Sequence, residues 1–340
     1  MAEKIKILIS RTDAIGDVVL TLPMCKVIKD FYGIENSTIT FLGKTYTEAI
    51  INSCSFIDRF LNYDSLVLLP INEQVEQLKL GNYDVIIHVY PNRKIAILAN
   101  KAGILLRIGT KNRWYHWLYC SKLVSLSRKN SDLHEAQLNI KLLEGIGIYK
   151  FLTVKEISKD ILLDKIKILP ERLAVLLDSN KFNLILHPKS NGSAREWSLD
   201  NYRKLIDLLP ENEFKIFISG IKSDDIEVNS WINNLPIHIS DLTGKMNLIE
   251  FISFINSADG LIAASTGPLH ISASLGKNTL GLYPPIKPIF PKRWAPLGPK
   301  ADFIVSEKEC GKCKRDISKC ECMDLISPEV VLEKIKTWKK

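Results

Sequence analysis

The sequence predicts an α/β protein with two doubly wound parallel sheets. Three observations predict this fold class: short apolar runs that suit buried strands alternate with amphipathic stretches, the alternation recurs in both halves of the chain, and 340 residues exceed what one ordinary hydrophobic core accommodates. Repeated strand–helix units favour parallel strands joined by right-handed crossovers. We therefore expect two Rossmann-like domains that face a cleft.

In the first half of the chain, short runs rich in Ile, Leu and Val predict strands at residues 5–10, 37–42, 85–89 and 106–108. Apolar residues at helical spacing predict helices after Gly16 and at residues 46–51, 71–80, 94–102 and 133–144. A charged stretch at residues 158–180 carries Pro170 and separates the halves. We therefore expect one domain over residues 1–170 and another over residues 171–340.

The second half of the chain repeats the alternation of strands and helices. Its apolar runs predict strands at residues 183–186, 215–218, 260–264 and 279–282. Helices are expected after Ser198, Asp224, Asn247 and Pro268. A terminal helix is expected over residues 328–338, because Ser327 is a good N-cap and Pro328 suits a first helical turn.

The charge and hydropathy of the chain limit its classes of function. The sequence has 46 Lys and Arg and 38 Asp and Glu, a formal net charge of +8 that suits an anionic ligand or an anionic membrane face. No dense basic run or motif indicates nucleic-acid binding. No stretch approaches the roughly 18 apolar residues of a membrane span. No signal peptide is recognisable, so we expect a cytoplasmic protein.

Several familiar cofactor and metal motifs are missing. The chain has no G-x-G-x-x-G fingerprint, and Gly43-Lys44-Thr45 fails as a Walker A motif because Thr38 stands where the first glycine is needed. Its six histidines include no H-E-x-x-H spacing. The sequence therefore supports neither a dinucleotide oxidoreductase nor a P-loop site nor a histidine metal site.

The segment Lys6–Pro23 is the most informative stretch of the chain. A strand at its start breaks into a polar loop, and Asp17 then falls in the first turn of a helix. A carboxylate at that position lies at the carboxyl edge of the sheet, where open α/β folds bind ligands. Asp17 is therefore a candidate catalytic residue. The alternative is that it only caps the helix and opposes its dipole.

Two loops in the second half have the composition of phosphate-binding sites. In the first, a strand ends at His187, and the loop that follows supplies small donors and two cations. Lys189, Ser190 and Arg195 of this loop can hold a diphosphate. The alternative is an ordinary polar loop with Trp197 packed beneath it.

The second such loop, Ser265-Thr266-Gly267, follows a buried strand, and Pro268 begins a helix after it. The free backbone N–H groups at this helix start suit an anion. His270 lies in the first turn and can donate to a phosphate or a sugar hydroxyl. A purely structural role for this histidine is the alternative.

Residues 111–119, Lys-Asn-Arg-Trp-Tyr-His-Trp-Leu-Tyr, combine cations with aromatic side chains that favour membrane interfaces. This stretch can rest on anionic lipid or hold a saccharide, and a partly buried helix with a basic rim is the alternative. Arg128 and His134 follow closely and are candidates for binding an acidic acceptor.

The seven cysteines are unevenly distributed. Cys25, Cys54 and Cys120 occur singly and are expected to be reduced core thiols. The four that cluster near the C-terminus are Cys310, Cys313, Cys320 and Cys322. Their density suits zinc, but the C-x-C spacing is unusual for a zinc site. Reduced thiols are the expectation for this cluster, and structural zinc is the alternative.

Motifs along nearly the whole chain occur in a recognisable order. They are Arg11–Pro23, His187-Pro188, Arg195–Trp197, Asp241–Gly244, Ser265–His270, Leu275–Lys277 and the tail from Cys310 to Pro328. This ordered set resembles glycosyltransferase family 9, the ADP-heptose:lipopolysaccharide heptosyltransferases. One motif alone would be weak, but the set in this order is specific.

The resemblance implies a GT-B fold, with the acceptor bound mainly by residues 1–170 and the donor nucleotide by residues 171–340. It implies inverting transfer, without a metal ion or cofactor, from a nucleotide-diphosphate sugar to a lipopolysaccharide-core or related glycolipid acceptor. ADP-heptose is the expected donor. The alternatives are a non-heptose nucleotide sugar and a catalytically silent saccharide-binding protein. The protein would act in the cytoplasm, with peripheral contact at the inner face of the cytoplasmic membrane.

The resemblance also assigns roles to residues. Asp17 matches the family's catalytic aspartate, which takes the proton from the acceptor hydroxyl. Apart from the resemblance, we expect Asp13, Arg128 and His134 to bind the acceptor. The predicted donor site consists of Lys189, Ser190, Arg195, Thr243, Gly244, Ser265, Thr266, Gly267 and His270.

Two features of these motifs affect the chemistry. The family usually has Asp or Asn where this chain has Ser265, and losing a charged hydrogen bond of about 1.5–3 kcal/mol leaves the identity of the donor sugar open. A helix N-terminus lowers the pKa of a carboxylate, so Asp17 is expected to be a weak base. Late proton transfer, from an acceptor already attacking the sugar, would tolerate a weak base.

Overall fold

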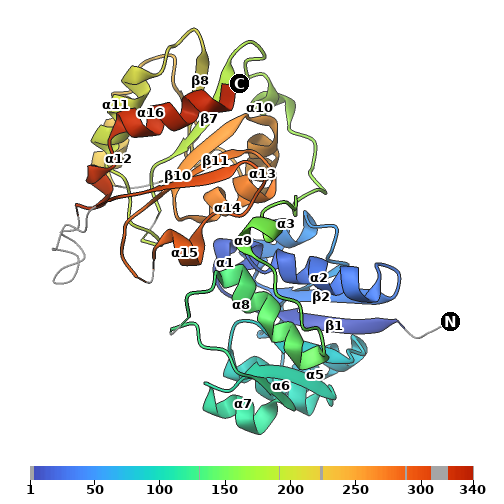
Figure 1. The fold of residues 1–340 in the computed structure, drawn as a ribbon. Coiled ribbons are helices and arrows are strands. Elements are labelled where there is room, and N and C mark those ends of the chain that lie inside the picture. The colour runs from blue at the N-terminus through green and yellow to red at the C-terminus, as the bar shows by residue number, and fades with distance from the viewer. Residues whose placement is uncertain are drawn as a thin grey trace. The chain divides into compact units, whose positions relative to one another are not determined.

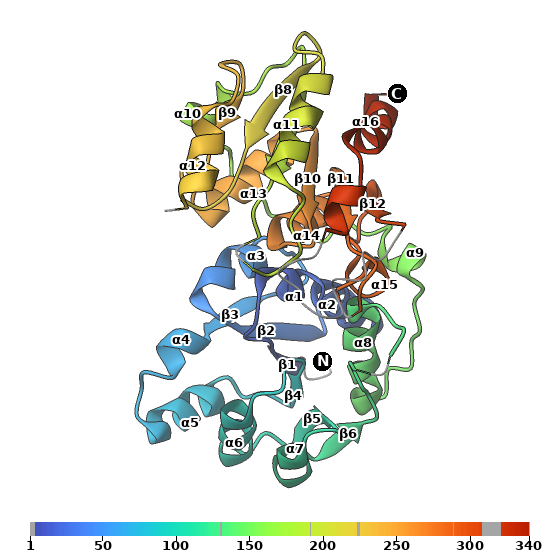
Figure 2. The same ribbon diagram turned by 90° about the vertical axis from the view of Figure 1, so that its left-hand side faces the viewer.

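The computed structural model describes residues 4–129, 131–190, 192–222, 225–287, 289–307 and 321–339. The chain divides into two units: the first contains Met1–Ile157 and Leu162–Lys165, and the second contains Ser158–Ile161 and Ile166–Lys340. Within the described residues, each unit contains one parallel sheet of six strands covered by helices (Figures 1 and 2). The predicted fold class is confirmed.

The sheet of the first unit has the strand order β3-β2-β1-β4-β5-β6, and all neighbouring strands are parallel. Its strands are β1 (Ile5–Ser10), β2 (Ser37–Gly43), β3 (Arg59–Asn62), β4 (Val85–His88), β5 (Leu106–Thr110) and β6 (Lys122–Val124). Residues Ile7, Leu8 and Ile9 of β1 are fully buried. The strand order reverses between β1 and β4, so their carboxyl ends flank the topological switch point, where open α/β sheets bind ligands.

The helices of the first unit include a break that the sequence pattern did not predict. They are α1 (Ile15–Val19), α2 (Leu22–Tyr32), α3 (Glu48–Asn52), α4 (Tyr63–Leu66), α5 (Ile71–Leu80), α6 (Arg93–Lys101), α7 (Trp114–Tyr119), α8 (Glu135–Lys141) and α9 (Val154–Ile157), with 3₁₀ turns at Thr45–Thr47 and Leu142–Ile146. The helix predicted after Gly16 is divided into α1 and α2. In a continuous helix the ring of Pro23 would clash with the carbonyl group of Val19. Pro23 lies instead in the first turn of α2, where no N–H is needed.

The sheet of the second unit has the strand order β12-β11-β10-β7-β8-β9, again with parallel neighbours. Its strands are β7 (Phe182–His187), β8 (Phe214–Ile218), β9 (Ser240–Asp241), β10 (Gly260–Ala264), β11 (Asn278–Tyr283) and β12 (Ala301–Val305). The topological switch point of this sheet lies between β7 and β10. The loops after these two strands are the two predicted phosphate-binding loops.

Except for the two four-residue helices, α10 and α15, which were not predicted, the helices of the second unit lie at the predicted positions. They are α10 (Glu171–Ala174), α11 (Leu199–Leu208), α12 (Ile226–Asn233), α13 (Leu248–Ser257), α14 (Gly267–Ser274), α15 (Pro291–Trp294) and α16 (Pro328–Lys336), with 3₁₀ turns at Met323–Leu325 and Thr337–Lys339. The Ser327 side chain caps the terminal helix α16, which packs beside α11 (Figure 1). Trp197 is 1% exposed and donates its indole N–H to the carbonyl oxygen of Ile326 at 2.9 Å, so its side chain belongs to the core of the second unit.

All eight predicted strands are present, and the four that the sequence did not reveal, β3, β6, β9 and β12, are the outer strands of the two sheets. An outer strand pairs on one side only and remains partly exposed, so it needs no continuous apolar run. The strand Ser240–Asp241 has no apolar residue at all. The periodicity of the sequence therefore identified the centre of each sheet and missed its margins.

Candidate active site

The loop between β1 and α1 places a group of charged side chains at the switch point of the first sheet. Arg11 and Asp13 follow directly on β1, and Asp17 lies in α1. The side chain of Arg11 is only 3% exposed, whereas those of Asp13 and Asp17 are 20% and 21% exposed. The guanidinium group is therefore the buried centre of this group, and the two carboxylates reach toward solvent.

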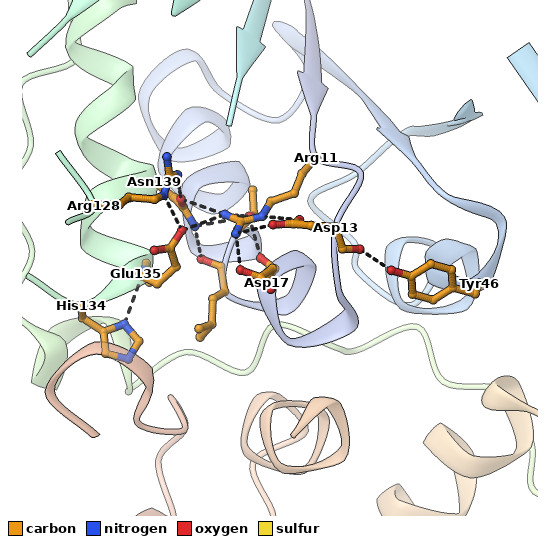
Figure 3. A network of polar contacts seen from close by, with 11 residues as sticks. Arg11, Asp13, Asp17, Tyr46, Arg128, His134, Glu135 and Asn139 are labelled. Carbon is orange, nitrogen blue, oxygen red and sulfur yellow. Dashed lines mark hydrogen bonds and ion pairs between the residues drawn. The ribbon is translucent and has the colours of Figure 1, made fainter. Parts of the chain in front are cut away.

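Arg11 forms ion pairs with three carboxylates (Figure 3). Its Nε and one terminal nitrogen donate to the two oxygens of Asp13 at 2.8 and 3.0 Å. The same terminal nitrogen donates to Oδ1 of Asp17. The other terminal nitrogen donates to Oε1 of Glu135 and Oδ1 of Asn139, both at 3.1 Å. A bidentate pair and a fixed guanidinium fork hold these side chains in one geometry.

Helix α8 supplies the far side of this network. Glu135 is fully buried and also accepts from Nε of Arg128 at 2.9 Å, while Asn139 accepts from the same guanidinium at 3.0 Å. Asn139 in turn donates to the carbonyl oxygen of Leu20 at 2.9 Å. Glu135 and Asn139 are four residues apart and therefore share one helix face. The predicted acceptor residue Arg128 thus belongs to the same network as Arg11.

His134 is 1% exposed and is the N-cap residue of α8 (Figure 3). Its Nδ1 accepts the backbone N–H of Ala136 at 3.2 Å, and its own backbone N–H donates to Oε1 of Gln137 at 2.9 Å. These two bonds form a capping box. The ring lies beside the charged network and orients the helix that carries Glu135.

The two aspartates of the loop differ in whether a carboxylate oxygen is available to a substrate. Both carboxylate oxygens of Asp13 are engaged by Arg11, and its carbonyl oxygen accepts the hydroxyl of Tyr46 at 2.6 Å. Arg11 engages only Oδ1 of Asp17, and no hydrogen bond from the described residues reaches Oδ2. Asp17 is therefore the carboxylate in this loop with an oxygen available for a proton.

The pKa of Asp17 is raised to about 6. Burial is the largest cause, and the charges of Asp13 and Glu135 add to it, so together they outweigh Arg11. The expectation that the helix start lowers this pKa is wrong. Helix α1 is only five residues long, so its dipole is weak compared with burial beside two other carboxylates. Although its own burial opposes ionisation, Arg11 has a raised pKa because Asp13, Asp17 and Glu135 surround it.

In the second unit, Glu196 organises the loop after β7. Its carboxylate accepts from the backbone N–H of Ser190 at 2.6 Å and from the Ser190 hydroxyl at 2.8 Å, and it pairs with the ammonium group of Lys189. Lys189 lowers the pKa of Glu196, although burial opposes this. The predicted donor residues Lys189 and Ser190 are therefore engaged by a neighbour that the sequence reading did not include. The sequence signal for this contact was the presence of Glu196 six positions after Ser190.

Arg195 of the same loop is half-buried, and it has neither a hydrogen bond nor an ion pair with any described residue. A half-buried guanidinium without a carboxylate partner is suited to an anionic ligand. His187, at the end of β7, is hydrogen-bonded through Nδ1 to the hydroxyl of Ser219 at 3.0 Å. Burial lowers the pKa of His187 to about 4, so the ring is neutral at pH 7.

The start of α14 lies on the other side of the same switch point. Thr266 is the N-cap residue, and its hydroxyl oxygen is buried with no hydrogen-bond partner among the described residues. Gly267 and Pro268 open the helix, so the backbone N–H groups of Gly267 and Leu269, which precede the first intrahelical hydrogen bond from His270 to Thr266, suit an anion. Ser265 precedes the N-cap residue, and His270 is 3% exposed within the helix.

The predicted residues Thr243 and Gly244 form a turn after β9. Oδ1 of Asp241 accepts from the backbone N–H of Thr243 at 2.9 Å and from its hydroxyl at 2.6 Å. Gly244 has a φ of +67° and donates its N–H to the carbonyl oxygen of Gly220 at 2.9 Å. A Cβ atom there would lie 2.8 Å from Cβ of Lys222, so only glycine fits. These contacts give the turn a structural role, and β9 is the outer strand, three positions from β10.

The described residues contain neither a metal-binding cluster nor a membrane-spanning helix. Across the part of the chain that the structure describes, no group of three or more His, Cys, Asp and Glu residues is placed to hold a metal ion. Cys25, Cys54 and Cys322 are buried thiols, whereas Cys310, Cys313 and Cys320 lie outside the described residues. None of the described helices combines the length and the apolar character needed to cross a bilayer.

The chain is similar to several known proteins. A Haemophilus influenzae protein named as a glycosyltransferase is 28% identical over 317 residues, which cover 90% of each chain. The lipopolysaccharide core heptosyltransferase OpsX of the same organism is 23% identical over 325 residues, covering 89% of this chain and 86% of OpsX. The solved structure of Escherichia coli ADP-heptose lipopolysaccharide heptosyltransferase II has a TM-score of 0.74 at 18% identity and covers 98% of each chain, so the two share the GT-B fold.

The family model for glycosyltransferase family 9 (heptosyltransferase) matches residues 72–324. The match includes both loops at the switch point of the second sheet. It begins after the loop that carries Arg11 and Asp17, so the role of that loop rests on its geometry. The matched range is well over half of the chain, and the chain therefore belongs to glycosyltransferase family 9.

Proposed function

We propose that this glycosyltransferase moves a heptose from ADP-heptose to a lipopolysaccharide-core acceptor, with inversion at the anomeric carbon and without a metal ion. The names of OpsX and of the E. coli enzyme support the choice of donor and acceptor. The observation that supports the mechanism best is the geometry of Asp17, with Oδ1 held by Arg11 and Oδ2 left available. The reaction takes place in the cytoplasm.

In this mechanism, Oδ2 of Asp17 accepts the proton of an acceptor hydroxyl while the hydroxyl oxygen attacks the anomeric carbon. The bond between that carbon and the diphosphate breaks on the opposite face, which inverts the configuration. A base works best when its pKa lies near the working pH, and a pKa of about 6 is closer to it than that of an ordinary aspartate. Arg11 keeps the carboxylate in place by its short contact to Oδ1.

The second unit supplies the groups that meet the charge of the departing diphosphate. We propose that Arg195, the Thr266 hydroxyl and the free N–H groups at the start of α14 bind the phosphates. Each of these groups is a donor without a partner among the described residues. Donors already aimed at the developing charge stabilise the leaving group without reorganising.

A second candidate keeps this mechanism and changes the donor sugar. Ser265 occupies the place of the usual acidic or amide residue of the family. A neutral hydroxyl holds a sugar hydroxyl less strongly than a carboxylate does. A nucleotide sugar other than ADP-heptose is therefore the alternative donor.

Thermal unfolding with nucleotides identifies the donor. ADP, GDP, UDP, CMP and their common sugar conjugates are added to the full-length protein, with and without EDTA. A ligand at one hundred times its dissociation constant is expected to add about 2.7 kcal/mol of stability. Selective stabilisation by ADP and ADP-heptose, unchanged by EDTA, supports the proposal. Selective stabilisation by another diphosphate favours the alternative donor, and stabilisation that EDTA removes contradicts metal independence.

The pH dependence of transfer tests the role of Asp17. Only the ionised carboxylate accepts a proton, so kcat/KM is expected to be constant above about pH 7 and to fall about tenfold per pH unit well below the pKa of about 6. The measurement is kcat/KM at about a dozen pH values between about 4.5 and 9. Circular dichroism at each pH confirms that the protein stays folded. A profile that stays flat down to pH 5 would exclude Asp17 as the base.

A further inference from the structure

The positive charge of the chain is concentrated in one segment of the first unit. Between Asp84 and Asp132 the sequence contains nine Lys and Arg residues and no Asp or Glu. The rest of the chain has 37 basic and 38 acidic residues, so this segment accounts for the whole excess of positive charge. Its basic residues are Arg93, Lys94, Lys101, Arg107, Lys111, Arg113, Lys122, Arg128 and Lys129.

Most of these cations face solvent without a carboxylate nearby. Arg107 donates to backbone carbonyl groups, including that of Tyr119 at 2.7 Å, and Arg128 pairs with Glu135. The other seven are exposed and have no ion pair with any described residue. They lie on α6, in the turn before α7, on β6 and in the chain that follows β6. An exposed array of one sign attracts a surface of opposite charge.

Helix α7, at the margin of the first sheet next to β5 and β6, adds an apolar face to this array (Figure 2). Trp114, Trp117 and Leu118 are 62%, 62% and 64% exposed. They are spaced at i, i+3 and i+4, so they lie on one side of the helix. The opposite side is anchored, because His116 is fully buried and its Nδ1 accepts the backbone N–H of Thr110 at 2.8 Å.

Local contacts hold both tryptophans among the cations. The guanidinium of Arg93 lies 5.0 Å from the centre of the Trp114 ring. The indole N–H of Trp117 donates to the carbonyl oxygen of Lys111 at 2.9 Å. Each ring is thereby oriented by a residue of the basic segment and still exposes more than half of its surface. Aromatic rings with an apolar body and a polar edge, flanked by Lys and Arg, are typical of side chains that bind the membrane interface.

We propose that the first unit docks on a membrane surface that contains anionic lipids, with α7 as the inserted element and the exposed cations of residues 93–129 around it. This inference goes beyond sugar transfer, because it concerns where the enzyme works. Trp114, Trp117 and Leu118 enter the headgroup layer, and the cations contact lipid phosphates. Charge complementarity favours anionic lipid over neutral lipid, and the exposed tryptophans favour a lipid surface over a purely charged partner.

Vesicle binding by the full-length protein tests this proposal. Wild-type protein is expected to bind vesicles of phosphatidylcholine and phosphatidylglycerol in equal parts, and not vesicles of phosphatidylcholine alone. Each Lys or Arg near an anionic surface contributes about a factor of five to binding, so the Lys111→Ala/Arg113→Ala variant is expected to bind about 30-fold more weakly. Brominated lipid is expected to quench the tryptophan fluorescence of the wild type and not that of Trp114→Phe/Trp117→Phe.

The chain offers a matched control surface in the same unit. Tyr149 and Phe151 are 79% and 70% exposed, and the exposed residues Lys150 and Lys155 lie beside them in the sequence. Lys150→Ala/Lys155→Ala removes the same charge as Lys111→Ala/Arg113→Ala. It is expected to weaken vesicle binding less than about threefold, because these two lysines do not contact the lipid. Equal loss in both variants would show that only net charge matters and would overturn the proposal.

Three further outcomes would also overturn it. The first is that the wild type does not bind anionic vesicles. The second is that a lipid-free lipopolysaccharide-core oligosaccharide changes the fluorescence of Trp114 and Trp117 while vesicles do not, because α7 would then be a sugar site. The third is a dimer in sedimentation that Trp114→Ser/Trp117→Ser dissociates. None of these measurements uses donor or transfer, so they are independent of the proposed reaction.

Discussion

Replacing Asp17 with asparagine is expected to lower kcat by about 10²–10⁴-fold, the usual contribution of a positioned general base. The amide can still accept the hydrogen bond that Arg11 donates to Oδ1, so the loop keeps its geometry. The atom at the Oδ2 position can no longer take a proton. Steady-state kinetics with donor and acceptor measure the loss, and the thermal shift caused by the donor nucleotide is expected to stay unchanged.

The same substitution is expected not to lower stability at pH 8. The folded-state pKa of Asp17 is about 6, above the unfolded value of about 3.8, so the native state favours the protonated form. The stability that protonation of this group contributes is full below pH 3.8 and is lost as the pH rises through 6. At pH 8 the carboxylate opposes folding, and asparagine removes that opposition. Activity should therefore fall without a fall in Tm.

Asp13→Asn is the matched control for the Asp17 variant. Asp13 is equally exposed and lies in the same loop, but its two oxygens are both engaged by Arg11. Its substitution weakens a bidentate ion pair and leaves the free oxygen of Asp17 in place. We expect a lower Tm and a much smaller loss of kcat. If Asp13→Asn removed activity and Asp17→Asn did not, the base would be Asp13.

Replacing Arg11 with methionine is expected to destabilise the first unit by about 3–5 kcal/mol, the cost of removing one partner of a buried ion pair. Glu135 is fully buried and would lose the guanidinium that helps to neutralise it, and Asp13 and Asp17 would lose their common donor. Activity is expected to fall with stability, because no other group holds Oδ1 of Asp17. Urea unfolding followed by circular dichroism measures the effect on the first unit.

Arg128→Met provides the comparison for the Arg11 variant. Arg128 shares Glu135 and Asn139 with Arg11, but its side chain is 25% exposed. Glu135 keeps its buried partner when Arg128 is removed, so we expect a loss of only about 1 kcal/mol. Equal destabilisation by the two variants would mean that Arg11 is not the centre of the network.

The sequence was sufficient to predict the fold because the central strands of both sheets are short apolar runs. Strands such as Gly260–Ala264 are buried on both faces, and burial on both faces requires that composition. An outer strand such as Arg59–Asn62 forms because it pairs with one neighbouring strand. This pairing cannot be predicted from local composition. The division between α1 and α2 was not predicted from the apolar spacing, although Pro23 is a local signal for it.

The candidate site was predicted as far as strand–loop–helix patterns define it. Asp17, Arg195 and Thr266 lie at loops that follow strands, and such loops can be identified locally. The contributions of Glu135 and Asn139 could not be identified, because they depend on α8 packing beside a loop more than 120 positions earlier. The pKa of Asp17 was predicted with the wrong sign for the same reason: burial and neighbouring carboxylates are tertiary properties.

The hydrogen bond between Arg11 and Glu135 joins residues 124 positions apart, and this separation affects how the protein folds during its synthesis. At a synthesis rate of 5–20 residues per second, about 6–25 s pass between their emergence on the ribosome. During this time β1 can begin to pack against apolar residues, but Arg11 has only the partly exposed carboxylates of Asp13 and Asp17 and not the buried one of Glu135. The loop that positions Asp17 is thus completed only when α8 has been translated, and a nascent chain shorter than this cannot hold the loop in its working form.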